Sequence, residues 1–414
     1  MKKFIIFCLI GVMIASLVAC TTPNINATPQ NAKDILADVD ANKVDTKDSL
    51  TPENSAKITD FGVKLLQSSL NSDKDNVLVS PISVIYALGM TANGADGDTL
   101  KEMENTFGLP IDELNSYMNA YLKTLKSDDK YKLNIANSIW VRKGVGFEPK
   151  SDFLQKNKDY YNAKIYEAAF DSNTVKEINS WVKDNTSGMI DSIIEKIPEE
   201  ARMYLINALA LEAEWEKKYS EGQVQKDDFT KEDGKTKEID FMYGSENSYI
   251  EGENEKGFLK YYVDRKYSFV ALLPNEGITI KNYVESLNGE KIHKLLNETK
   301  EVKVNTSIPK FENEFSISLN DGLKNMGIKK AFDANESDLS KIGKNLMISN
   351  VLHKTYISVH EQGTKAGAVT AVEVGVTSMP VEKPKEVYLN RPFVYMIVDT
   401  ENNVPLFIGT YEGK

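Results

Sequence analysis

The chain has 414 residues, of which 41% are hydrophobic and 27% are charged, and its formal net charge is -11. This composition predicts a globular protein with a large core, not a disordered chain. The acidic balance argues against nucleic acid and anionic lipid as partners, because both carry negative charge.

The first twenty residues have the pattern of an export signal. Two lysines precede an apolar run at residues 4–18, which is shorter than the ~20 residues that a membrane-spanning helix needs. The Leu-Val-Ala-Cys sequence at residues 17–20 resembles the lipobox of bacterial lipoproteins, in which the chain is cut before the cysteine and the cysteine is acylated. The resemblance implies a signal peptide at residues 1–19 and a lipid on Cys20, with the protein secreted and held at the bacterial cell surface. An ordinary signal peptide with an incidental cysteine is the alternative.

The chain has two cysteines, Cys8 and Cys20. Cys8 lies within the apolar run, so the processed body would carry no disulfide and would rely on its core for stability. The one remaining cysteine leaves neither a credible thiol nucleophile nor a thiolate metal cluster. Contact with the membrane would therefore come from the lipid on Cys20 and not from a basic surface.

Residues 20–50 are rich in Thr, Asn, Asp, Pro and Lys, with few apolar positions. This composition predicts a lipid-anchored tether that lifts the folded body off the membrane. Ile35 and Leu36 are apolar exceptions, and the alternative is that they dock on the body and stabilise it. The folded domain is expected over residues 51–414.

Helix and strand patterns follow one another along the domain. The proline after Thr51 is typical of a capped helix start, and apolar residues recur at helical spacing over residues 58–66. Helical patterns then dominate the first half of the chain, and strand patterns dominate the second. Residues 267–273 predict a buried strand, and residues 393–398 and 404–408 predict a hairpin. Helices first and strands later favour an α+β fold over alternating units.

Four polar residues stand within apolar surroundings, namely Ser80, Ser83, Asn207 and His353. Buried polar groups need hydrogen-bond partners, so these side chains are expected to satisfy one another or the backbone. A histidine that is simply satisfied in the core, with no role in a conformational change, is the alternative.

The segment that starts at Glu361 has the pattern of a loop able to become a strand. Every second residue is small or β-branched and could lie on a buried face: Thr364, Ala366, Ala368, Thr370, Val372 and Val374. Lys365 falls on the opposite face. The segment ends near Pro380 and Pro384, and two prolines would disrupt a central strand.

This segment and several other motifs resemble the serpin family. In chain order, the other motifs lie at residues 76–83, 94–99, 179–182, 205–208, 309–311, 326–328, 338–340, 351–354 and 405–409. The resemblance covers residues 51–414. It implies the serpin fold, with three β-sheets, eight or nine helices and an exposed reactive-centre loop, the hinge and loop spanning about residues 361–389.

The resemblance also implies a role for individual residues. The expected hinge residues are Glu361, Gly363, Thr364, Ala366 and Ala368. The expected shutter, a polar cluster beneath the point where the main sheet opens, is Ser80, Ser83, Asn207 and His353. The expected breach residue, at the top of that sheet, is Trp215, and the expected reactive bond joins Thr377 to Ser378. Met379 and Val381 are alternative positions for the cut.

A serpin of this kind would be a suicide inhibitor of serine proteases that traps the acyl-enzyme by inserting the cleaved loop into its main sheet. Thr377 suits an elastase-like or subtilisin-like target, and the protein is expected to be a monomer without cofactor or metal. Enzyme function is not expected, because the chain has three histidines and no Gly-x-Ser-x-Gly motif. A non-inhibitory serpin that acts as a binding or scaffold protein on the cell surface is the alternative.

Overall fold

The computed structural model describes residues 29–70, 76–125, 131–364 and 383–413. Within these ranges the chain forms nine α-helices, four 3-10 helices and sixteen strands, which confirms the predicted α+β class and the number of helices. None of the described helices is long and apolar enough to span a bilayer.

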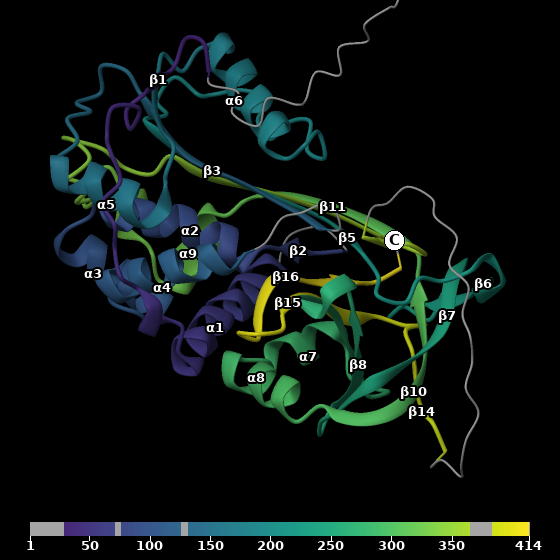
Figure 1. Cartoon of the computed structure of the whole chain (residues 1–414). Coiled ribbons are helices and arrows are strands. Elements are labelled where there is room, and N and C mark those ends of the chain that lie inside the picture. The colour runs from purple at the N-terminus through teal and green to yellow at the C-terminus, as the bar shows by residue number, and fades with distance from the viewer. Residues whose placement is uncertain (1–28, 71–75, 126–130, 365–382, 414) are drawn as a thin grey trace, which may run out of the picture.

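The α-helices lie mainly in the first half of the chain (Figure 1). They are α1 (Pro52–Ser69), α2 (Pro81–Ala92), α3 (Gly97–Phe107), α4 (Ile111–Thr124), α5 (Ser151–Tyr161), α6 (Ser172–Asn185), α7 (Ile280–Glu285), α8 (Gly289–Asn297) and α9 (Asn320–Met326). The 3-10 helices are η1 (Lys47–Ser49), η2 (Glu221–Gln223), η3 (Val263–Arg265) and η4 (Lys330–Phe332). The predicted start of α1 is confirmed, because the Thr51 side chain accepts a hydrogen bond from the Asn54 amide.

The first sheet has seven strands in the order β1-β4-β3-β5-β13-β12-β11. Its strands are β1 (Lys33–Asp34), β3 (Tyr131–Arg142), β4 (Ile165–Ala168), β5 (Met203–Glu214), β11 (Phe311–Ser318), β12 (Asn350–His360) and β13 (Gly363–Thr364). The twelve-residue β3 lies where helical patterns were expected to dominate.

The second sheet has nine strands, eight of them in the order β14-β10-β7-β8-β9-β15-β16-β2, with β6 also paired to β7. Its strands are β2 (Leu78–Val79), β6 (Val224–Thr230), β7 (Thr236–Glu251), β8 (Glu255–Tyr261), β9 (Tyr267–Pro274), β10 (Lys300–Pro309), β14 (Lys385–Tyr388), β15 (Phe393–Asp399) and β16 (Val404–Tyr411). The predicted strand at residues 267–273 and the predicted hairpin are both present.

The described strands thus form two hydrogen-bonded sheets, whereas the serpin resemblance implies three. One edge of β7 pairs first with β6 and then with β8, while β10 follows its other edge. Because this sixteen-residue strand is continuous, it joins into one sheet the strands that would otherwise form two.

The first sheet is covered on both faces (Figure 1). Helix α6 packs on one face, where Trp140, Tyr166 and Trp181 form the centre of a smaller apolar cluster. The larger core fills the other face, between the first sheet, the second sheet and helices such as α1 and α2. Any strand added to the first sheet would therefore place alternate side chains in these two environments.

The prediction of a free tether fails for residues 29–50. Strand β1 pairs antiparallel with β4 through Lys33 and Asp34, and the Leu36 side chain is 1% exposed in the core. Thr46 is also buried and donates a hydrogen bond to the Asn119 side chain at 3.0 Å. Leu36 lies in the core and Ile35 packs against it, so the segment docks on the body, as in the alternative given for these two residues.

Candidate functional site

The seam between β5 and β12 is the line along which the first sheet would have to part. The two strands pair directly and in parallel, from the pair Tyr204 and Asn350 at one end to Ala210 and Tyr356 at the other. The seam is therefore closed by a hydrogen-bonded ladder over seven residue pairs.

Beyond this closed seam, the strands are held apart by the two residues of β13. Gly363 lies opposite Glu214 of β5 and His360 of β12, in antiparallel register with both. Thr364 lies opposite Ala213 and Val359 in the same way. Two of the expected hinge residues, Gly363 and Thr364, thus already lie between β5 and β12.

Gly363 can occupy its position because it has no side chain. Its φ is +152°, a value that L-residues rarely adopt, and a Cβ atom would collide with the carbonyl oxygen of Ala213. The hinge backbone therefore approaches β5 more closely than any larger residue would allow.

Trp215, the expected breach residue, fastens the chain just before β13. Its indole N–H donates to the His360 carbonyl at 2.8 Å, and its backbone N–H donates to the Gln362 carbonyl at 2.9 Å. Its ring is fully buried and stacks on Tyr262, with the ring centroids 4.4 Å apart. The Tyr262 hydroxyl in turn lies 2.7 Å from the Thr364 hydroxyl, and both residues are fully buried.

Glu361 is held from two sides. Its carboxylate pairs with the Lys310 ammonium of the short link to β11 at 2.6 Å, and its carbonyl accepts from the Tyr219 amide at 2.9 Å. Burial opposes ionisation of Glu361, but the hydrogen bond and charge of Lys310 outweigh it, so the pKa of the carboxyl lies below its usual value.

A buried ion pair lies under the same region. The Lys260 ammonium is 2.8 Å from the Glu246 carboxylate, and their side chains are 2% and 7% exposed. The ammonium also donates to the Lys217 carbonyl and lies 4.3 Å from the centre of the Tyr219 ring. Burial lowers the pKa of Lys260, while the charge of Glu246 opposes that effect. This pair links β7 to β8 beneath the hinge.

The four predicted shutter residues are brought together near the middle of the seam. The amide of Ser80 donates to Nε2 of His353 at 3.0 Å, and Nδ1 of His353 contacts the side-chain oxygen of Asn207. The Ser83 amide donates to the Ser80 hydroxyl at 3.2 Å, which caps α2. His353 and Asn207 are also direct neighbours across the seam.

The partners of His353 define its protonation. Nε2 accepts a hydrogen bond from a backbone N–H, so the proton of the neutral ring is on Nδ1, where it is donated to Asn207. Burial lowers the pKa of His353 to about 3. The ring is therefore neutral at pH 7, and a second proton would break its contact with Ser80.

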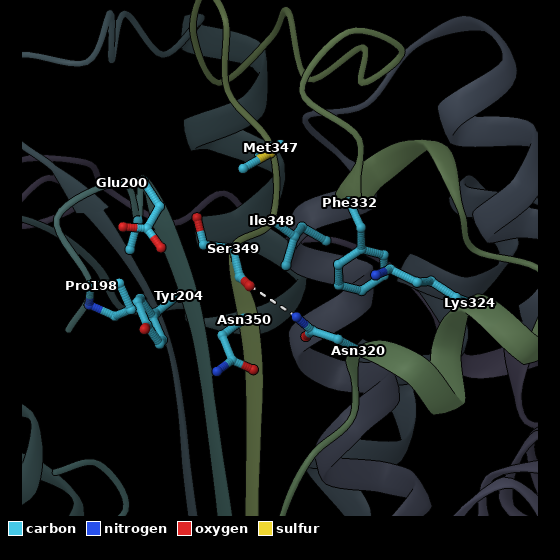
Figure 2. A pocket seen from close by; sticks show the side chains of 11 residues that line it. Pro198, Glu200, Tyr204, Asn320, Lys324, Phe332, Met347, Ile348, Ser349 and Asn350 are labelled. Carbon is cyan, nitrogen blue, oxygen red and sulfur yellow. Dashed lines mark hydrogen bonds between the residues drawn. The ribbon is translucent and has the colours of Figure 1, made fainter. Parts of the chain in front are cut away.

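A cavity of about 260 Å³ lies at the other end of the seam. Figure 2 shows Tyr204 of β5 and Asn350 of β12 in its lining, with Asn320 of α9 donating to the Ser349 carbonyl at 2.9 Å. Lys324 and Glu200 lie on opposite sides of it. The cavity thus borders both strands of the seam where the seam begins.

Two important residues, Asn137 and Tyr262, were not identified from the sequence. Asn137 of β3 accepts from the Ser83 hydroxyl at 2.8 Å and lies beside Asn207 in the sheet, so it extends the shutter. Its position among apolar residues was an available signal. Tyr262 had no comparable signal, because aromatic residues are common in strands.

Other predicted site residues lie outside the described part of the chain. These are the hinge residues Ala366 and Ala368, the reactive bond between Thr377 and Ser378, and the lipid site Cys20. The other predicted site residues of this region lie together at the end of the seam where β13 separates β5 from β12, namely Glu361, Gly363, Thr364 and Trp215.

Comparison with known proteins agrees with this geometry. The family model "Serpin (serine protease inhibitor)" matches residues 56–412. An uncharacterized serpin-like protein from Thermococcus kodakarensis is 31% identical over 83% of this chain and 82% of its own length. A leukocyte elastase inhibitor from Xenopus tropicalis is 31% identical over 87% of this chain and 99% of its own length.

Two crystal structures of tengpin, a thermophilic serpin, represent its native and latent states, and this chain can be compared with each. Its native state is 46% identical and gives a TM-score of 0.89, covering 93% of this chain and 100% of tengpin. The comparison with its latent state covers 90% of this chain and 99% of tengpin and gives a TM-score of 0.75. The chain is thus more similar to the native form, in agreement with the closed ladder between β5 and β12. On these grounds the chain belongs to the serpin family.

Proposed function

We propose that this protein is a suicide-type inhibitor of serine proteases, with an elastase-like or subtilisin-like enzyme as its target. The observation that carries the proposal is β13, a two-residue strand that already lies between β5 and β12 at the start of the seam. Such a strand needs no new nucleation: residues that follow it can add to the same ladders as the seam parts.

The register of β13 supports this proposal. Thr364 lies opposite Ala213 and Val359, and each later residue of an antiparallel strand would move one residue back along both neighbours. Thr370 would then arrive between Asn207 and His353, which are themselves partners across the seam. The small inward residues of the loop would follow Thr364 onto the core face, while Lys365 would face the other way.

The same register predicts where the inserted strand would end. Glu373 would lie opposite Tyr204 and Asn350, the first residue pair of the closed seam. Both of these residues border the cavity described above (Figure 2). Residues 367–373 would therefore replace the whole of the direct pairing between β5 and β12.

The covalent step fits a protease that forms an acyl-enzyme. The protease serine would attack the carbonyl carbon of Thr377, the bond to Ser378 would break, and the new amino group of Ser378 would leave with a proton. Insertion of residues 365–374 would add about ten ladder hydrogen bonds at ~0.5–1.5 kcal/mol each, or on the order of 10 kcal/mol. This is comparable to the stability of a whole domain and could hold the tethered protease in a distorted state.

We also place the protein at the bacterial cell surface through a lipid on Cys20. The support is the sequence pattern at residues 17–20. Mass spectrometry of the mature N-terminal peptide tests it: an unmodified Cys20 would contradict the lipid anchor.

The inhibitory mechanism is tested by a complex that resists denaturation in SDS. The wild-type protein should form one with an elastase-like protease, and the released peptide should begin at Ser378. Thr364→Arg should abolish the complex and leave a plain substrate, because a charge would enter the core face. Lys365→Arg, the matched control on the opposite face, should still form it. Cleavage of the wild type without a complex would favour the non-inhibitory alternative.

A further inference from the structure

Tyr262 joins the second sheet to the hinge. It follows β8 directly, forms an isolated bridge with Trp215, and lies with its hydroxyl 2.7 Å from that of Thr364. Both side chains are fully buried. Within the described part of the chain, each hydroxyl has the other as its one hydrogen-bond partner.

We propose that Tyr262 is a positioning residue for loop insertion, holding Thr364 in the sheet so that the new strand starts in the correct register. The inference rests on the proposed inhibitory function. Trp215 and Tyr219 hold the hinge backbone as far as Gln362, whereas the Tyr262 hydroxyl contacts the side chain of Thr364, the second residue of β13.

The geometry explains why a hydroxyl is used here. Thr364 is on the core face of the sheet, where an unpaired hydroxyl is costly. Burial raises the pKa of Tyr262 far above its usual range, so its hydroxyl is neutral and can either donate or accept. A shift of β13 by one residue would turn Thr364 away from Tyr262. The hydroxyl pair therefore favours the one register that would bring Thr370 to Asn207 and His353.

Tyr262→Phe isolates the contribution of this hydroxyl. The phenyl ring can still stack on Trp215, whereas Thr364 loses its partner. Hydrogen exchange at the amides of residues 357–364 should accelerate roughly tenfold, the factor that corresponds to one buried hydrogen bond. The number of inhibitor molecules consumed per trapped protease should rise several-fold, because slower insertion lets more acyl-enzyme hydrolyse.

Matched variants separate positioning from general stability. Tyr117→Phe removes a similar buried hydroxyl pair with Ser55, at 3.1 Å in the helical region, and should leave the stoichiometry unchanged. Thr364→Ser keeps a hydroxyl beside Tyr262, whereas Thr364→Val removes it, so hinge exchange should be slower in Thr364→Ser than in Thr364→Val. Tyr262→Phe with Thr364→Val removes both hydroxyls and should be less impaired than the sum of the single variants.

The two readouts distinguish this inference from the proposed function. If hinge exchange in Tyr262→Phe equals that of wild type, the positioning role is wrong, whatever the inhibition. If exchange accelerates but wild type traps no protease, the hinge contact stands and the inhibitory function is wrong. An unchanged stoichiometry in Tyr262→Phe, with wild type inhibitory, also rejects the positioning role.

Discussion

His353 connects three parts of the molecule through its two ring nitrogens. It lies in β12, accepts from the cap of α2 and donates to Asn207 of β5. Its contacts require a neutral ring with the proton on Nδ1. A conformational change that parts β5 from β12 must replace the contact between His353 and Asn207. In the register that we propose, insertion would bring the hydroxyl of Thr370 to that place.

The protonation of His353 predicts a pH dependence of stability. Its pKa of about 3 in the folded protein lies below the ~6.5 of an unfolded histidine. Between these values the unfolded chain binds a proton and the folded chain does not, so stability falls as the pH drops below about 6.5. Between pH 7.5 and 5.5 the loss from this residue should be about 1.4 kcal/mol.

Urea unfolding of wild type and His353→Gln at the two pH values measures this loss. Glutamine can accept from Ser80 and donate to Asn207 but does not titrate, so the variant should lose about 1.4 kcal/mol less than wild type. His293 and His360, whose pKa values are also lowered by burial, are present in both proteins and cancel. Equal losses would show that folding does not lower the pKa of His353.

The sequence predicted those site residues that stand out from their neighbours along the chain. A polar residue in an apolar run must find a partner, and this singled out Ser80, Asn207 and His353. The identity of the partner depends on strands distant in sequence, so the bond from Ser83 to Asn137 could not be derived. Tyr262 became recognisable only when its hydroxyl was placed beside Thr364.

At the scale of elements, composition gave a wrong prediction where a few residues decide whether a segment docks on the body. Residues 29–50 have the polar composition of a linker, but β1 and the buried Leu36 fix them to the body. Long elements with strong patterns, such as α1 and β9, were predicted correctly. The junction of the sheets was not, because only pairing reveals that β7 continues from one group of strands into the next.

The docked segment should contribute to stability through Leu36. Leu36→Ala removes a side chain that is 1% exposed in the core and should lower the free energy of unfolding by about 2 kcal/mol, the lower end of the range for such changes. Lys43→Ala, at an exposed position of the same segment, should change it by less than ~0.5 kcal/mol. Urea unfolding checks both. A Leu36→Ala variant as stable as wild type would show that the segment detaches in solution.

At the scale of the whole molecule, β5 and β12 are separated by β13 at one end of the seam and pair directly with each other along the rest of it. β13 separates β5 from β12 at one end, and seven residue pairs hold the two strands together below it. The free energy of insertion is therefore the difference between two new ladders with the inserted strand and the one ladder that is lost. A covalent link between β5 and β12 would keep the two strands from parting and so prevent insertion, while leaving their native pairing unchanged.

A disulfide between positions 208 and 354 should provide this link. Ala208 and Lys354 are partners across the seam, and adjacent strands ~4.8 Å apart satisfy the geometry of a disulfide. The native cysteines are Cys8 and Cys20; in a soluble chain without residues 1–19 and with Cys20→Ser, the new pair is therefore alone. Oxidised, this protein should be cleaved by the target protease without forming a complex.

Reduction should restore the trap in the same molecules. With the disulfide opened, β5 and β12 can part and an SDS-resistant complex should appear. Lys354→Cys alone is the matched control: it loses the ion pair of Lys354 with Glu314 but cannot form the link, so its complex formation should be the same in oxidising and reducing buffer. If the oxidised double variant traps protease as well as the reduced one, the loop does not enter between β5 and β12. Insertion along this seam would then be wrong as the source of inhibition.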